Sequence, residues 1–231
     1  MCGRITQKTG ELPGLVTITA SEPLTEPFRP RYNGAPSLNY WVIRRHPETG
    51  KYHRDLLIWG FIPNWTKEPS GGRRPINARA EGISSSGMFR NAYARRRCLI
   101  PIDNFFEWRA VKGQKWKQPY AIAMKSGEPF ALGAVWESWT RPTTGEIVRS
   151  FAIITTSANE AVSFIHDRMP VIIASENYKR WLSIEPDPYD LLKPYPSEPM
   201  TIWPIGRKVG SPDNDTPDIL DPVDLPGTEV G

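Results

Sequence analysis

Short runs of β-branched and aromatic residues recur along the chain and are separated by turn-forming residues. The 231 residues include 24 Pro and 18 Gly, which break the chain into short pieces and argue against long helices. Runs of this kind are typical of strands. We predict strands at residues 40–44, 55–59, 98–102, 120–124, 130–136, 151–155, 171–174 and 201–203, and we read the aromatic run 105–108, which contains Glu107, as a further strand.

Helical signals are fewer. We predict a helix at residues 88–97, a second that begins at Ser157 with a capping box to Glu160, and a third at 176–182 behind Ser175. Many short strands with a few short helices indicate an α+β fold, in which a single domain is built on a barrel-like, largely antiparallel β core.

The charge is unevenly distributed. The whole chain has 29 Lys and Arg against 25 Asp and Glu, but six of the acids and none of the bases follow residue 210. We therefore divide the chain into a basic domain at residues 1–210 and an acidic, Pro-rich tail at 211–231. The tail has the composition of a weakly ordered segment, although Ile219, Leu220 and Val223 can pack back onto the domain.

A basic domain favours a polyanionic partner, because Lys and Arg gain affinity for phosphates by releasing counterions. Aromatic residues precede arginines along one stretch, with Trp59, Phe61 and Trp65 before Arg74 and Arg79. Such interleaving is typical of single-strand binding surfaces. A solvated basic surface with the tryptophans in the core is the alternative.

No apolar run reaches membrane-spanning length and no secretory signal is visible, so we expect no membrane partner and a reducing compartment. That compartment is the cytoplasm, close to the nucleoid, in a bacterium, or the nucleus in a eukaryote. The two cysteines, Cys2 and Cys98, form neither a disulfide framework nor a metal-binding pattern. We expect Cys98 to be a buried core thiol.

Cys2 is the first candidate for chemistry. Removal of Met1 would leave an α-amine and a thiol on one Cα. An α-amine titrates near pH 8 and a lysine amine near 10.4, so the α-amine is the better imine-forming group at neutral pH. The adjacent thiol can then close a five-membered thiazolidine, with an effective molarity on the order of 10⁵ M or more. The alternative is an incidental residue at a frayed terminus.

Three further residues suit proton transfer or substrate binding. Glu107 lies among aromatic residues, where poor hydration turns a carboxylate into a useful proton carrier, unless it faces solvent. His166 could shuttle protons, although a lone histidine is more often structural. Asn77 could assist chemistry on an aldehyde, or it could be only a turn former. Asp167 and Arg168 are adjacent and could form a local ion pair.

Eight motifs occur in order between Cys2 and about residue 205, and together they resemble the SRAP (SOS-response-associated peptidase) family. They read Met1-Cys2-Gly3-Arg4, Arg31-Tyr32-Asn33-x-x-Pro36, Trp59-Gly60-Phe61-x-Pro63-x-Trp65, Asn77-Ala78-Arg79-Ala80-Glu81, Arg97-Cys98-Leu99-Ile100-Pro101, Phe106-Glu107-Trp108, Thr155-Thr156-x-Ala158-Asn159 and His166-Asp167-Arg168-Met169-Pro170-Val171. The resemblance implies a monomeric SRAP-like domain that shields abasic sites in single-stranded DNA by covalent crosslinking during the damage response, with no metal or organic cofactor.

Carried onto this sequence, the resemblance implies that Cys2 is the nucleophile, that Asn77 binds the sugar-derived part of the adduct, and that Glu107 and His166 move protons. It implies a set of DNA-binding residues, namely Gly3, Arg4, Asn33, Trp65, Arg79 and Arg168. Two other functions remain open: a thiol peptidase that removes Met1 or cuts other proteins, and a noncovalent single-strand binder. We also expect the acidic tail to compete with DNA for the basic surface.

Overall fold

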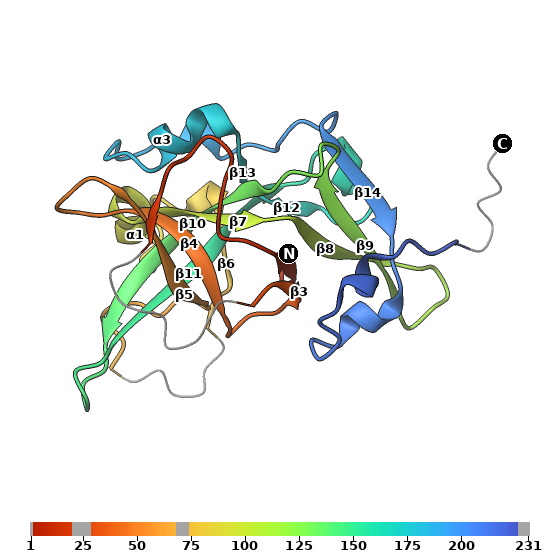
Figure 1. Cartoon of the computed structure of the whole chain (residues 1–231), viewed down its shortest axis with the longest axis horizontal. Helices are drawn as coiled ribbons and strands as arrows, with labels where there is room; N and C mark the ends of the chain where they lie inside the picture. The colour runs from red at the N-terminus through yellow and green to blue at the C-terminus, as the bar shows by residue number, and fades with distance from the viewer. Residues whose placement is uncertain (1, 20–28, 68–73, 226–231) are drawn as a thin grey trace.

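A closed barrel of five strands forms the centre of the protein in the computed structural model, which describes residues 2–19, 29–67 and 74–225. Four antiparallel pairings join the strands, and a parallel pairing of the last with the first closes the ring (Figure 1). In order they are β5 (Tyr52–Trp59), β4 (Asn39–Arg45), β7 (Arg97–Ile102), β10 (Phe130–Thr140) and β11 (Ile147–Ser157).

A second, five-stranded sheet lies beside the barrel. Its order is β14 (Met200–Pro204), β9 (Lys117–Met124), β8 (Asn104–Ala110), β1 (Ile5–Gln7) and β3 (Arg31–Gly34), and all of its pairings are antiparallel. Only one residue separates β7 from β8, so the chain passes directly from the barrel into this sheet (Figure 1).

The remaining elements are short, as the Pro and Gly content predicts. They are β2 (Ile18–Thr19), β6 (Asn77–Arg79), β12 (Arg168–Pro170), β13 (Ile172–Ile173), α1 (Arg90–Arg95), α2 (Glu160–Ser163), α3 (Tyr178–Trp181), and 3-10 turns at Ala80–Gly82, Ser175–Asn177, Tyr189–Leu191, Arg207–Gly210 and Pro217–Leu220. The predicted α+β class with a barrel-like β core is confirmed. No helix within the described ranges is long and apolar enough to cross a membrane.

Aromatic rings fill the barrel. Trp59 and Phe151 stack with centroids 6.2 Å apart, and Tyr40 meets both edge-on. Such packing is worth about 0.5–1.5 kcal/mol per pair beyond the area buried. Cys98 is fully buried in the same cluster, as predicted, and so is Cys2. Cys2 is therefore part of the buried core of the barrel.

The helix predictions were right in place and wrong in detail. The first helix covers only Arg90–Arg95, because Arg97 begins β7. The capping box from Ser157 does not form, since Ser157 pairs with Arg168 at the end of β11. Asn159 caps α2 instead and accepts a hydrogen bond from the Val162 amide at 2.9 Å. The third predicted helix divides into the 3-10 turn Ser175–Asn177 and α3.

The tail is better ordered than its composition suggests, and the prediction of weak order is wrong for residues 211–225. Ile219 is fully buried, the indole of Trp203 donates to the Leu220 carbonyl at 2.8 Å, and Val223 donates to the Pro204 carbonyl at 3.0 Å. The predicted packing of these apolar residues onto the domain is confirmed. Residues 226–231 lie outside the described ranges, and the division at residue 210 stays a prediction.

Candidate functional site

Strand pairing places Cys2 beside Glu107. β1 and β8 pair with Ile5 opposite Phe105, and the Phe106 amide donates to the Arg4 carbonyl at 3.0 Å, which continues the pairing toward the terminus. In this register Gly3 falls opposite Glu107. The aromatic neighbours predicted for Glu107 are present, and its side chain is 2% exposed.

Asn77 reaches the same place from the barrel. β6 pairs in parallel with β11, and Asn77 lies opposite Ile153. The Asn77 side-chain amide donates to the Cys2 carbonyl at 2.8 Å, across 75 residues of sequence. Its Oδ1 is buried and has no hydrogen-bond partner in the described part of the chain. This oxygen can therefore accept a hydrogen bond from a hydroxyl group of a bound molecule.

Burial raises the pKa values of both Cys2 and Glu107. Burial raises the pKa of the Cys2 thiol far above its ordinary value, and the nearby Glu107 carboxylate raises it further. Burial also raises the pKa of Glu107. The thiol is therefore uncharged at neutral pH, and the carboxyl is adjusted toward a proton carrier rather than a permanent anion.

His166 lies between α2 and β12. Its Nδ1 accepts a hydrogen bond from the Arg168 amide at 3.0 Å, so the neutral ring carries its proton on Nε2. Nδ1 is also 2.7 Å from the Asp167 carboxylate, which can accept a hydrogen bond from the Nδ1–H group when the ring is protonated. Burial lowers the pKa of His166, so the neutral form dominates at pH 7.

The positive charge of Lys117 acts on both Glu107 and His166. Its charge lowers the pKa values of both, although less than burial changes them. Sequence analysis missed Lys117 and also Tyr120, which lies directly opposite Glu107 in the β8–β9 hairpin. Pairing the aromatic run 105–108 with the strand at 120–124 would have found Tyr120.

Two of the predicted DNA-binding residues are open to solvent. Arg79 is exposed on β6, two residues after Asn77 and so on the same face of the strand. Trp65 is 65% exposed in a turn that is held by a 2.6 Å hydrogen bond from the Trp139 indole to the Thr66 carbonyl. Gly3 is half-buried beside Cys2.

Arg4 and Asn33 make contacts within the protein instead. The Arg4 guanidinium donates to Asn33 Oδ1 at 2.7 Å and to the Val209 carbonyl at 2.8 Å. The Asn33 amide donates to the carbonyls of Val209, Ser211 and Asn214 at 3.2, 2.8 and 2.9 Å. Asn33 is 2% exposed, so these bonds join the N-terminal strand to the C-terminal segment.

Arg168 forms a bidentate pair with Glu81, with distances of 2.5 and 3.0 Å, and donates to the Thr155 carbonyl at 2.6 Å. The hydrogen bonds from Arg168 lower the pKa of Glu81. The alternative of an Asp167–Arg168 ion pair is not realised, because Asp167 contacts His166. Arg168, the first residue of β12, thus connects this strand to Glu81 and to Thr155 of β11.

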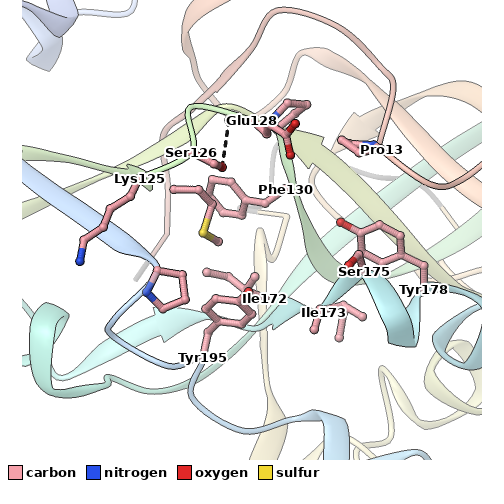
Figure 2. Close-up of a pocket in the computed structure, with 14 residues that line it drawn as sticks. Pro13, Lys125, Ser126, Glu128, Phe130, Ile172, Ile173, Ser175, Tyr178 and Tyr195 are labelled. Atoms are coloured by element: carbon pink, nitrogen blue, oxygen red, sulfur yellow. Dashed lines mark hydrogen bonds between the residues drawn. The ribbon is translucent and has the colours of Figure 1, made fainter.

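The cavity in Figure 2 belongs to a different region. Phe130, Ile172 and Tyr195 face one another across a space of about 290 Å³, and none of Cys2, Asn77, Glu107 or His166 lines it. No group of three or more His, Cys, Asp or Glu side chains in the described ranges is arranged to hold a metal ion.

Comparison with known proteins gives concordant matches. The abasic site processing protein YoqW of Bacillus subtilis is 38% identical over 198 residues, which cover 84% of this chain and 87% of that protein. The abasic site processing protein YedK of Escherichia coli is 28% identical, over 96% of this chain and all of its own length. A crystal structure of a protein from Bacteroides thetaiotaomicron superposes with a TM-score of 0.76 at 28% identity, over 84% of this chain and 85% of that one.

The match to a family model covers residues 1–212, which span both sheets and all of the residues gathered around Cys2. The chain therefore belongs to the SOS response associated peptidase (SRAP) family.

Proposed function

We propose that this protein processes abasic sites in single-stranded DNA by forming a thiazolidine crosslink through Cys2, once Met1 has been removed. The observation that carries the proposal is the hydrogen bond from Asn77 to the Cys2 carbonyl, which brings a substrate-binding amide to the predicted nucleophile across two sheets. The similar proteins YoqW and YedK are abasic site processing proteins, and this supports the choice of substrate.

An abasic site is mainly a closed hemiacetal, which must open before an amine can attack. The protonated form of His166 can give its Nε2 proton to the ring oxygen and become neutral, while the ionised Glu107 accepts the proton of the 1-hydroxyl. The Cys2 α-amine then adds to the aldehyde carbon and gives a carbinolamine. Glu107 gives a proton to the departing hydroxyl, which leaves as water, and then takes back the N–H proton, which gives the neutral imine.

The thiol closes the ring in the last step. Sγ bonds to the imine carbon, the C=N double bond becomes single, and the thiol proton ends on nitrogen with Glu107 as carrier. Because the Cys2 thiol has a raised pKa, it acts only after the amine has placed it against the carbon. A thiol peptidase needs a thiolate with a lowered pKa, so the shift favours crosslinking over general proteolysis.

Intact-protein mass spectrometry tests the proposal. The protein is mixed with a single-stranded oligonucleotide that contains one abasic site, and with the same oligonucleotide without it. The expected adduct equals the protein without Met1 plus the DNA minus one water, it forms without borohydride, and Cys2→Ala abolishes it. A complex that dissociates fully in denaturant, or an adduct retained by Cys2→Ala, would overturn the proposal.

A further inference from the structure

An exposed aromatic ring lies close to the site without belonging to the predicted set. Phe164 directly follows α2, two residues before His166, and is 45% exposed. The Arg109 guanidinium lies over its ring, 5.4 Å from the centroid. Single apolar residues on a surface are common, but a ring with a cation held over it presents both a stacking surface and a charge.

A short series of contacts connects Phe164 to Glu107. Glu107 and Tyr120 lie directly opposite in β8 and β9, so their side chains are on the same face of the sheet, with Cβ atoms about 5 Å apart. The Tyr120 ring meets Phe164 edge-on, with centroids 5.5 Å apart. Phe164 is therefore roughly 10 Å from Glu107, by the cross-strand spacing. A DNA strand that rises 3.4 Å per nucleotide covers this distance in about three nucleotides or fewer.

Positive charge accompanies the ring. Arg109 and Lys117 are both exposed, on neighbouring strands of the same hairpin. Arg109 lies on the same face of the hairpin as Glu107 and Tyr120, whereas Lys117, opposite Ala110, starts from the other face. Phe164 and Arg109, here called the α2 patch, thus combine a ring with a phosphate-binding group. This is the combination that single-strand binding proteins use, since every base has a face that can stack.

We propose that the α2 patch binds one nucleotide that flanks the abasic site, with the base stacked on Phe164 and the backbone phosphate paired with Arg109. This inference rests on the proposed function and extends it, because it names a residue that holds the strand next to the reacting sugar. Phe164 is then a positioning residue for the strand. A purely structural role, in which Phe164 only supports Tyr120, is the competing explanation.

The experiment combines a side-chain change with removal of a base. Phe164→Ala, Phe164→Leu and Phe164→Trp are compared with the unchanged protein, and Ile184→Ala, which removes an apolar residue that is 78% exposed elsewhere, is the matched control. The substrates carry one abasic site, and in a series a reduced, aldehyde-free residue without a base replaces each of the three nearest nucleotides on either side. Crosslinking rates are measured below saturation, and binding is measured by fluorescence anisotropy.

We expect Phe164→Ala to slow crosslinking and weaken binding about tenfold on the fully based strand, a loss typical of one stacked base. Phe164→Leu should lose nearly as much, and Phe164→Trp and Ile184→Ala should lose nothing. At one flanking position, removal of the base should reduce the effect of Phe164→Ala to less than twofold. An equal loss on every substrate, or no loss on any, would overturn the inference. Absence of crosslinking by the unchanged protein would overturn the proposed function. Fluorescence anisotropy would then still show whether Phe164→Ala weakens DNA binding and so would test the α2 patch separately.

Discussion

Replacement of Asn33 by alanine should release the C-terminal segment from the N-terminal strand. The Asn33 side chain accepts one hydrogen bond from Arg4, and its two amide protons are shared among the carbonyls of Val209, Ser211 and Asn214. Alanine removes the Asn33 amide group and leaves Arg4 and the three carbonyls without this partner, at a position that is 2% exposed. Water cannot replace them without entering the contact.

The magnitude follows from the bonds lost. Two neutral hydrogen bonds contribute about 1 kcal/mol each, and the bond from a guanidinium contributes about 1.5–3 kcal/mol. The expected loss in the free energy of unfolding is therefore about 3–5 kcal/mol. A domain of this size loses about 2–4 °C in Tm per kcal/mol, so Asn33→Ala should melt roughly 6–20 °C lower.

Thermal unfolding by circular dichroism measures the shift, and limited proteolysis should show faster cleavage after residue 209. Asn39→Ala is the control, because Asn39 is an exposed asparagine at the start of β4 and its loss should cost less than about 0.5 kcal/mol. A Tm within 2 °C of the unchanged protein would refute the reasoning. If the Asn33→Ala variant kept its Tm but lost affinity for DNA, Asn33 would be a direct DNA contact, as the family resemblance implies.

Three further changes test the electrostatics of the protein. Glu107→Gln should abolish crosslinking yet raise Tm at pH 8, because burial destabilises the charged carboxylate of the unchanged protein. The gain in Tm should vanish below about pH 4.5, where the carboxyl is protonated in both the folded and the unfolded state. A lower Tm of the variant at pH 8 would contradict this reasoning. Arg79→Ala should weaken binding to undamaged single strands of any sequence and reduce the slope of log K against log salt by about 0.7; an unchanged slope would show that Arg79 meets no phosphate. Replacement of the exposed acids Asp213, Asp221 and Asp224 by asparagine should tighten single-strand binding at low salt but not at high salt, if the tail competes with DNA, and equal affinity at low salt would exclude competition.

Deletion of residues 211–231 would not be a clean test of that competition. Asp215 accepts hydrogen bonds from the Tyr32 and Asn33 amides at 2.6 and 2.7 Å, and Ile219 is fully buried. Deletion would therefore destabilise the domain and confuse the effect of charge with the effect of unfolding. Neutralising only exposed acids keeps these contacts.

Local patterns in the sequence were sufficient for most of the architecture. Short runs of β-branched and aromatic residues between turn formers predicted the strands that build the barrel, because strand preference is encoded in neighbouring residues. The order of eight motifs predicted the family, whereas the aromatic neighbours of Glu107 left a buried and a solvent-facing position open, of which the structure has the buried one. Helix ends were less predictable, since the Asn159 cap and the Ser157 pairing compete at almost the same place.

Only the tertiary structure decided which polar groups meet. Arg168 could have paired with its neighbour Asp167, but it binds Glu81, 87 residues away. The Asn33 amide, predicted to bind DNA, donates to the carbonyl of Asn214, 181 residues away. Side-chain chemistry and short-range periodicity are written in the local sequence, whereas the partner of a buried donor depends on how distant strands register. Such pairings arise when the sheets close and most buried polar groups must find partners at once.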